Sequence, residues 1–129
     1  MPDELDLLAD RRSMRAGANG QRPMRVLLVD DHDISRAAVS ALLRTQGAEV
    51  ADLGTGDAAL AVAIAFRPAV AIIDVTPTDA SGFVIADRLR ALPDGPAVVL
   101  TSSADRRWFA SRLDSYRFVA KADLCIQAI

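Results

Sequence analysis

Three aspartates stand where short apolar runs of this chain end. Asp30 and Asp31 follow the apolar residues 26–29, and Asp74 closes the run 70–73. A carboxylate next to a buried segment is costly unless it is paired, hydrogen-bonded or bound to a cation. If the three acids lie together they repel one another, and a hard divalent cation relieves that repulsion. Because Mg²⁺ prefers carboxylate, water and phosphate oxygens, the pattern predicts a magnesium site.

Two further polar groups close apolar runs in the second half of the chain. Thr101 follows residues 97–100, and Lys121 follows residues 117–120. With a metal bound, Asp74 has the chemistry of a nucleophile that attacks a phosphoryl group and forms an aspartyl-phosphate. The ammonium of Lys121 and the hydroxyl of Thr101 would then stabilise the charge on the phosphoryl oxygens. Together these side chains predict a phosphoryl-accepting site.

From residue 25 onward, apolar runs alternate with helix-length segments, which predicts parallel strands connected by helices. The predicted strands are residues 26–29, 49–53, 70–74, 97–100 and 117–120. The predicted helices are residues 33–46, 55–67, 83–92 and 104–113. Residues 123–129 are long enough for about two further helical turns.

The first helix has clear signals at both ends. Asp33 is the predicted N-cap and Gly47 the terminator. We expect His32 near the helix start at the rim of the site rather than as a ligand, since Mg²⁺ prefers oxygen. The predicted apolar face of this helix consists of Ile34, Ala38, Ala41 and Leu42.

Five units of this size predict an α/β fold of the flavodoxin-like, doubly wound type. Its five-stranded parallel sheet has the order 2-1-3-4-5, and its last helix is truncated. In this topology the ligand crevice lies at the carboxyl ends of the first and third strands. Because those strands lead into Asp30, Asp31 and Asp74, the acids are predicted to converge at the crevice.

The composition is that of one soluble domain. The chain has 129 residues, a mass of 13.7 kDa and a formal net charge of −2, which gives no reason to expect direct nucleic-acid binding. Its single cysteine leaves no internal disulfide and favours the reducing cytoplasm. No run approaches the roughly 20 apolar residues that span a bilayer, so no membrane role is expected.

Residues 1–23 differ from the rest of the chain. They begin with an acidic, leucine-containing segment and continue with a stretch rich in Arg, Gly and Asn. This composition predicts a mostly disordered N-terminal arm, with residues 24–129 forming the folded domain.

Four motifs of residues 24–129 stand in a characteristic order and spacing: Val29-Asp30-Asp31-His32, the strand ending at Asp74 with Gly82 eight residues later, Leu100-Thr101-Ser102, and Phe118-Val119-Ala120-Lys121. These motifs resemble the receiver domain of bacterial two-component response regulators. The start at Asp30-Asp31-His32 and the end at Lys121-Ala122-Asp123 are most similar to receivers that precede a helix-turn-helix output domain.

The resemblance implies a phosphoacceptor rather than an enzyme with a separate substrate. Asp74 would receive the phosphoryl group from a sensor histidine kinase or a phosphotransfer protein. The domain would assist its own phosphorylation and dephosphorylation. The groups that would hold Mg²⁺ are Asp30, Asp31, Asp74 and the backbone carbonyl of Thr76.

The resemblance also implies a conformational switch. Lys121 would contact the phosphoryl group, and Thr101 and Phe118 would form the switch pair. Phosphorylation would draw Thr101 inward and let Phe118 rotate toward the core. The surface of the fourth helix, the fifth strand and the last helix would then change, and a second receiver is one partner for that surface.

The sequence departs from the family pattern in three loops and at its end. The link at residues 114–117, before the fifth strand, is shorter than usual and lacks the family's glycine. Thr78 stands where the family usually has a proline, four residues after Asp74, and Ala122 replaces the proline after Lys121. The family's last helix runs several turns, whereas this one stops at Ile129. We therefore expect exposed apolar surface, low stability or association, unless the chain belongs to a longer regulator.

Two other functions stay open. Residues 74–78 are similar to the Asp-Lys-Thr-Gly-Thr motif of ion-pumping ATPases and their phosphatase relatives, which would make the protein an aspartyl-phosphate phosphohydrolase. Those enzymes carry the nucleophile on the first strand, whereas Asp74 is predicted on the third, and no acid stands two residues after it. The other alternative is a non-phosphorylated, receiver-like protein-binding module.

Overall fold

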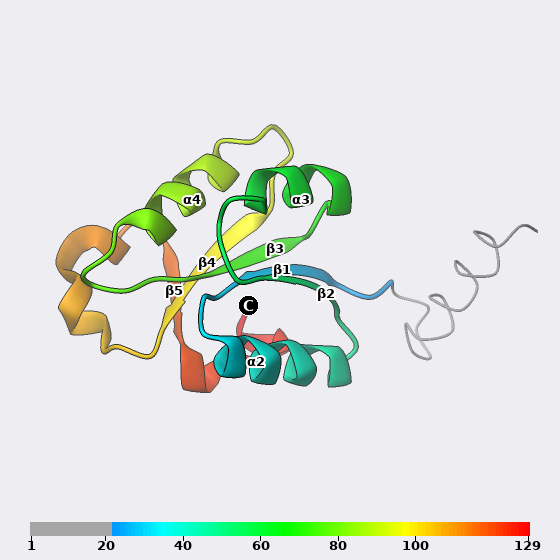
Figure 1. The fold of residues 1–129 in the computed structure, drawn as a ribbon, viewed down its shortest axis with the longest axis horizontal. Coiled ribbons are helices and arrows are strands. Elements are labelled where there is room, and N and C mark those ends of the chain that lie inside the picture. Colours follow the sequence, from blue (N-terminus) through cyan, green and yellow to red (C-terminus); the bar gives the residue numbers. More distant parts are fainter. Residues whose placement is uncertain (1–21) are drawn as a thin grey trace, which may run out of the picture.

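The computed structural model describes residues 22–129, so nearly all of the predicted N-terminal arm lies outside the described residues. A sheet of five parallel strands, in the order β2-β1-β3-β4-β5, forms the centre (Figure 1). The predicted sheet order and all five predicted strands are confirmed. The strands are β1 Arg25–Val29, β2 Glu49–Leu53, β3 Val70–Asp74, β4 Ala97–Ser102 and β5 Arg117–Ala120.

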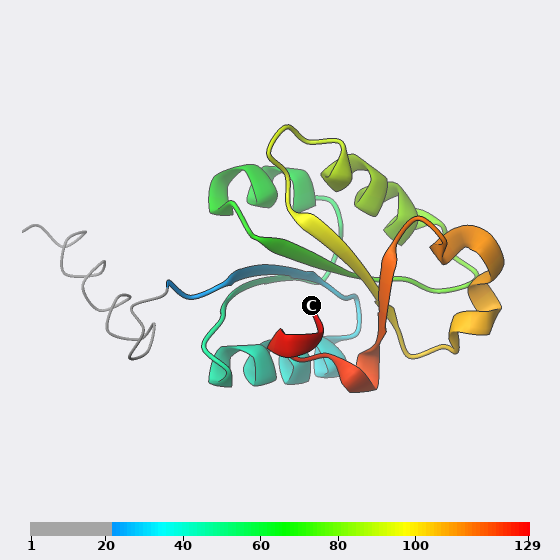
Figure 2. The same ribbon diagram turned by 180° about the vertical axis from the view of Figure 1, so that it is seen from behind.

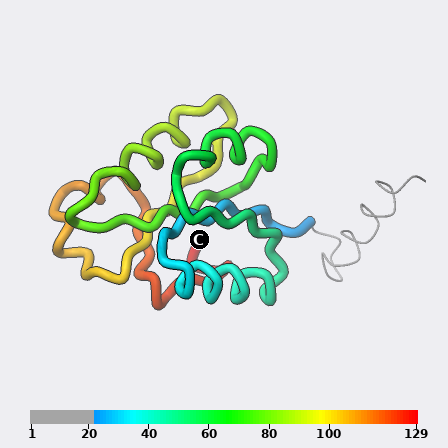
Figure 3. Tube along the Cα trace, in the orientation of Figure 1, coloured from blue at the N-terminus to red at the C-terminus, as the bar shows by residue number. Residues whose placement is uncertain are grey.

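Helices lie on both sides of the sheet (Figures 1 and 2). Helices α3 (Ala59–Phe66) and α4 (Ser81–Arg90) lie on one side, and α2 (Asp33–Thr45) lies on the other beside the C-terminal residues. The chain path in Figure 3 passes from one side to the other, as a doubly wound fold requires. None of the helices in residues 22–129 is both long enough and apolar enough to cross a membrane.

The central strands are buried on both faces, which explains their unbroken apolar runs. Successive residues of a strand point to opposite faces. Leu27 accordingly packs in the cluster that contains Leu89 and Phe109, below α3 and α4. Leu28 packs in the second cluster, with Leu43 of α2.

The predicted apolar face of α2 is wrong. All four residues of that face are exposed, and Ile34 is exposed by 89%. The buried stripe includes Ser40, whose hydroxyl donates to Asp52 Oδ2 over 2.8 Å. A satisfied serine on the buried face lowers the apolar signal of that face, so the neighbouring stripe looks more hydrophobic in sequence. The buried residues of α2 are Val39, Ser40 and Leu43.

The start of α2 also differs from the prediction. Asp33 is the first helical residue rather than the cap, and its Oδ1 pairs with Arg36 Nη2 at 2.9 Å. His32 occupies the cap position without a side-chain cap bond, and its backbone N–H donates to Asp30 Oδ1 at 3.0 Å. The N-terminus of α2 is therefore hydrogen-bonded to Asp30, an acid of the predicted site. The predicted terminator of α2, Gly47, is confirmed by a φ of +97° directly after the helix.

Three further helix predictions need correction. Helix α3 begins at Ala59, later than predicted, because residues 54–58 form a loop, and α4 is shifted two residues toward the N-terminus. Residues 104–113 do not form an α-helix. The segment η1 (Arg106–Leu113) is a 3₁₀ helix interrupted at Ala110, where φ is 50° and ψ is −134°. A 3₁₀ helix rises about 2.0 Å per residue instead of 1.5 Å, so this segment is longer than an α-helix of the same number of residues.

The C-terminal segment forms two separate 3₁₀ turns instead of the continuous turns predicted for residues 123–129. These are η2 (Lys121–Asp123) and η3 (Ile126–Ala128), and Ile126 packs, half-buried, against the second core cluster. A last helix that is truncated is therefore confirmed, whereas low stability or association stays a prediction. A shallow groove beside this segment is lined by Ser35, Ala38, Val39, Leu42, Lys121, Ala122 and Leu124.

Gly47→Ala is expected to lower the free energy of unfolding by about 1 to 2 kcal/mol, because its φ lies in the left-handed region that disfavours a Cβ. No atom lies within 4 Å of the position of that Cβ, so the cost is conformational and not steric. Urea unfolding of the wild type, Gly47→Ala and Gly47→Asn measures it. Asn tolerates the left-handed region better, so a loss equal in both variants would contradict this explanation.

Candidate functional site

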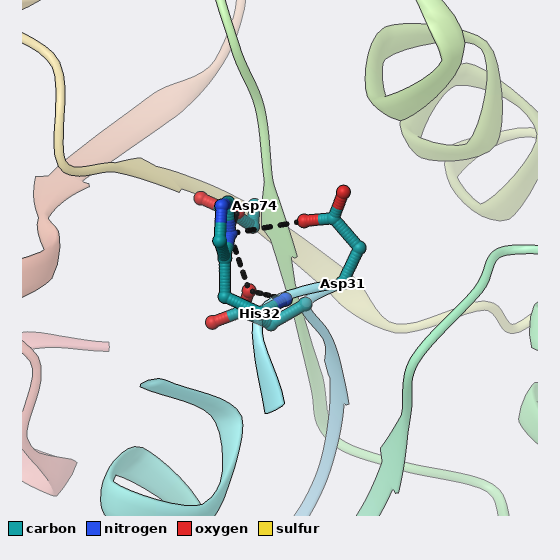
Figure 4. Close-up of side chains that lie close together, drawn as sticks. Asp31, His32 and Asp74 are labelled. Atoms are coloured by element: carbon teal, nitrogen blue, oxygen red, sulfur yellow. Dashed lines mark hydrogen bonds and ion pairs between the residues drawn. The ribbon is translucent and has the colours of Figure 1, made fainter. Parts of the chain in front are cut away.

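The predicted acids meet at the carboxyl edge of the sheet. Strands β1 and β3 are neighbours, with Val29 paired to Ile73, so Asp30 and Asp74 leave the sheet side by side. Asp31 and His32 follow on the loop into α2. Ligand atoms of these four residues lie within 4.8 Å of one another. Figure 4 shows Asp31, His32 and Asp74 gathered above the ends of the two strands.

Asp30 is almost fully buried, with 1% of its surface exposed, and is fully hydrogen-bonded. Its Oδ1 accepts from the His32 backbone N–H at 3.0 Å. Its Oδ2 accepts from Ser35 Oγ at 2.9 Å and from Lys121 Nζ at 3.1 Å. Burial alone would raise the pKa of Asp30, but these bonds together outweigh burial and hold the pKa below its usual value. Asp30 is thus a fixed negative charge in the site.

Asp74 has a different environment. Its carboxylate is 5% exposed, and burial raises its pKa to about 6. The attraction of Lys121, whose Nζ lies 3.4 Å from Asp74 Oδ1, opposes this rise, and repulsion from Asp30 adds to it. The contacts of Asp74 therefore do not fully compensate its negative charge, and a bound cation would favour the ionised form of this carboxylate.

His32 lies among the three carboxylates. Its Nδ1 is 3.0 Å from Asp31 Oδ1, 3.5 Å from Asp30 Oδ1 and 3.7 Å from Asp74 Oδ2. The sequence predicted a residue at the rim and missed this central position, although the adjacency of His32 to the acid pair was the available signal. The ring occupies the space that a cation shared by the acids would take, and it is 62% exposed, so it has room to turn away. The oxygen donors of the acids fit Mg²⁺.

Thr101 lies next to Asp74 on the neighbouring strand, whereas Phe118 lies on β5, paired to Leu100. Thr101 is paired to Asp74 across β3 and β4, and the hydroxyl of Thr101 donates to the backbone carbonyl of Val119 over 2.7 Å. Phe118 is half-buried and its ring lies 6.0 Å from that of Phe109. The hydroxyl is thus engaged with β5, and the ring is held in the core cluster below α4.

An open cleft of about 720 Å³ adjoins the site. The walls of the cleft include Asp31, Asp74 and Thr76, together with residues of the 54–57 loop and of α4. Gly82 at the start of α4 allows the close approach, because a Cβ there would lie 2.9 Å from the Asp74 carbonyl oxygen. The cleft leaves Asp74 reachable from outside despite its low exposure.

Asp74→Asn is expected to stabilise the metal-free protein by about 1 to 2 kcal/mol near neutral pH. The pKa of Asp74 is about 6 in the folded state against an ordinary 3.8, so between these values the folded state binds more protons. The contribution of Asp74 to stability therefore rises as the pH falls through 6, and the advantage of the variant shrinks toward about pH 5.

Urea unfolding in EDTA at both pH values measures the difference. Asp79→Asn is the matched control. This exposed carboxylate accepts from the Ser81 backbone N–H, which lowers its pKa, so its neutralisation should not stabilise the fold. An Asp74→Asn variant less stable than the wild type near neutral pH would contradict the expected charge strain.

Comparison with known proteins agrees with this geometry. Residues 26–122 match the response regulator receiver domain family. Over 88 residues, 68% of this chain and 37% of the relative, the chain is 38% identical to the probable transcriptional regulatory protein TcrX of Mycobacterium tuberculosis. It is 39% identical over 88 residues, 67% of this chain and 26% of the relative, to a protein-glutamate methylesterase/protein-glutamine glutaminase of Anaeromyxobacter dehalogenans. The chain thus spans between 26% and 37% of the length of these curated relatives.

Solved structures share the fold. A receiver domain from Methylobacillus flagellatus, described as CheY-like, has a TM-score of 0.67 at 21% identity, over 82% of this chain and 92% of that chain. The response regulator protein TrrA from Thermotoga maritima, solved in complex with Mg²⁺-BeF, has a TM-score of 0.64 at 20% identity, over 75% and 85% of the two chains. The match of residues 26–122 spans most of the chain, and the chain belongs to the response regulator receiver domain family.

Proposed function

We propose that this chain is the phosphoacceptor of a two-component phosphorelay and that Asp74 receives the phosphoryl group. The observation that carries the proposal is the buried pair of Asp74 and Asp30, bridged by Lys121 Nζ at 3.4 and 3.1 Å beside an open cleft. The donor is a phosphohistidine of a sensor histidine kinase or a phosphotransfer protein. A carboxylate oxygen of Asp74 attacks the phosphorus, the phosphorus–nitrogen bond breaks, and the released imidazole takes a proton.

Mg²⁺ is the cofactor of the proposed reaction. Asp30, Asp31, Asp74 and the backbone carbonyl of Thr76 would hold it. When bound, it neutralises negative charge on the transferring phosphoryl oxygens. Support comes from the oxygen donors gathered at the sheet edge and from the Mg²⁺-BeF complex of the similarly folded TrrA. For the cation to bind there, the His32 ring would turn away from the space between the carboxylates.

Lys121 and Thr101 act on the phosphorylated form. Lys121 already bridges two carboxylates, and its ammonium pairs with a phosphoryl oxygen once Asp74 carries the group. Thr101 gives up its bond to Val119 and donates to the phosphoryl group, and Phe118 rotates toward the space that Thr101 leaves. The surface of η1, β5 and the C-terminal turns changes as a result.

The proposal also covers the setting of the domain. Residues 24–129 form the receiver, with residues 1–23 as an arm, in the cytoplasm. The domain assists its own phosphorylation and dephosphorylation and has no separate substrate. Its proposed partners are the phosphodonor and a second receiver. The net charge of −2 gives no reason to expect direct nucleic-acid binding, so any effect on transcription would pass through other segments or proteins.

The test is incubation of the 129-residue chain with acetyl phosphate and Mg²⁺, followed by mass spectrometry. One base-labile, acid-stable phosphoryl group on the peptide that contains Asp74 is expected, and EDTA should abolish it. Beryllofluoride with Mg²⁺ should bind as a non-covalent mimic. If the chain takes up no label and binds no mimic, the result would favour the binding module. Multiple turnover of a phosphoester would favour the phosphohydrolase.

A further inference from the structure

Arg36 connects three segments around the acid pair. This residue lies in the first turns of α2, and its side chain is 21% exposed. Its Nη1 donates to the backbone carbonyl of Asp30 at 2.9 Å, and its Nη2 contacts Asp33 Oδ1 at 2.9 Å. Its Nε lies 3.6 Å from Asp52 Oδ1 on β2. One planar guanidinium thus reaches the end of β1, the start of α2 and the adjacent strand.

Asp52 is held firmly enough to serve as an anchor for Arg36. Its Oδ2 accepts from Ser40 Oγ at 2.8 Å, and Arg44 Nη2 lies 3.4 Å from the same oxygen. Ser40 is itself buried. The contacts of Asp52 therefore come from successive turns of α2, and they fix the position of the carboxylate that faces Arg36.

The fold also leaves room for the guanidinium. A Cβ at Gly54, just after β2, would lie only 2.8 Å from Arg36 Nη1. The glycine therefore allows Arg36 to lie flat across the ends of β1 and β2, where it meets the Asp30 carbonyl.

The carbonyl that Arg36 holds belongs to the peptide that joins Asp30 to Asp31. The Asp30 side of this peptide is fixed by other bonds, since the Asp30 backbone N–H donates to the Leu53 carbonyl at 3.0 Å. The carboxylate of Asp31 is 74% exposed, and its contact with His32 Nδ1 at 3.0 Å is to a ring that must itself move. The orientation of the Asp30–Asp31 peptide therefore determines where the Asp31 carboxylate points.

We infer that Arg36 is a positioning residue for cation binding. Anchored by Asp52, it fixes the Asp30–Asp31 peptide so that Asp31 presents its carboxylate toward Asp74. Arg36 does not touch the cation or the phosphoryl group. The inference rests on the proposed function, because it assigns Arg36 to the same Mg²⁺ site.

The role needs the shape of arginine and not only its charge. A lysine keeps the positive charge, but its single ammonium does not bridge a carbonyl and two carboxylates with a rigid fork. Positioning therefore predicts that Arg36→Lys and Arg36→Met both bind Mg²⁺ more weakly. If Arg36 acted only by its charge, Arg36→Lys would bind like the wild type.

The experiment measures the Kd for Mg²⁺ by isothermal titration calorimetry for the wild type, Arg36→Lys, Arg36→Met and Asp52→Asn. Loss of an outer contact to a metal ligand typically costs about 10-fold to 100-fold in affinity, so the Kd of both Arg36 variants is expected to rise at least about 10-fold. Asp52→Asn should raise it in the same direction, since Arg36 loses its anchor. Circular dichroism checks that each variant is folded, and Arg36→Lys carries the test if Arg36→Met does not fold.

Arg25→Met is the matched control. Arg25 also bridges a carbonyl and a carboxylate, with Nη1 3.0 Å from the Phe66 carbonyl and Nε 3.5 Å from Glu49, but at the opposite edge of the sheet. Its Kd for Mg²⁺ should match the wild type even if the fold is destabilised. A wild-type Kd in Arg36→Lys, or an equal loss in Arg25→Met, would overturn the positioning role while leaving the proposed function intact. A wild type that neither binds Mg²⁺ nor accepts phosphate overturns both.

Discussion

Asp74→Asn is expected to accept no phosphoryl label from acetyl phosphate under conditions that label the wild type fully. The amide has nearly the shape of the carboxylate but lacks the anionic oxygen that attacks phosphorus. Asp30 and Lys121 stay in place. Asp30 keeps its hydrogen bonds from the His32 backbone N–H, Ser35 Oγ and Lys121 Nζ, and none of these bonds involves residue 74. The loss is therefore one of chemistry and not of assembly.

The stability measurement separates this loss from unfolding. The same variant is expected to be more stable than the wild type in the absence of metal, so missing label cannot be assigned to a disordered site. Asp79→Asn, at the edge of the same cleft, should be labelled at the wild-type rate. Label that persists in Asp74→Asn, at any residue and at the wild-type level, would contradict the assignment of the acceptor.

Lys121→Met is expected to slow phosphorylation by about 10²-fold to 10³-fold, the range for removing one preorganised charge-stabilising donor. Methionine has a similar length and no charge. Lys121 is the only lysine among the 129 residues, and every other fixed side-chain cation is an arginine. The Lys121 side chain is 15% exposed, and its Nζ lies 3.4 Å from the carboxylate that would receive the phosphoryl group.

The affinity for Mg²⁺ distinguishes transition-state stabilisation from general damage. The substitution removes a cation that competes with the metal for Asp30 and Asp74, so Mg²⁺ binding should be retained or tightened while the labelling rate falls. Arg117→Met likewise removes one positive charge, but Arg117 lies at the start of β5 and donates to the Ala128 carbonyl, away from the carboxylates. Parallel losses of labelling in both variants would assign the effect to net charge and sink the specific role of Lys121.

The edge of the sheet was predictable because its signals are local. Each of Asp74, Thr101 and Lys121 follows an apolar run, and the carboxyl ends of parallel strands lie at one edge. Their convergence needed only the strand order, which follows from five strands of this kind with helical connections. The same holds for Gly47, whose position after a helix already indicates a left-handed residue.

Other features depend on contacts between distant segments. The buried face of α2 includes Ser40 because Asp52, on another strand, satisfies its hydroxyl. The segment η1 is interrupted at Ala110, and no periodicity within residues 104–113 encodes that break. His32 lies among three carboxylates that follow two strand ends. Arg36 donates to the Asp30 carbonyl, six residues earlier, and is held in place by Asp52 on β2.

The hydrogen bond from Thr101 to the Val119 carbonyl has a consequence for how the domain carries information. A hydroxyl has a single hydrogen, so Thr101 donates to one acceptor at a time. While the bond to β5 is made, that hydrogen is withheld from the carboxyl edge, and a phosphoryl oxygen that takes it leaves Val119 without it. In the proposed switch the two acceptors would therefore exclude each other. Each molecule would be in one form or the other, and a graded signal would come from the fraction of molecules in each form.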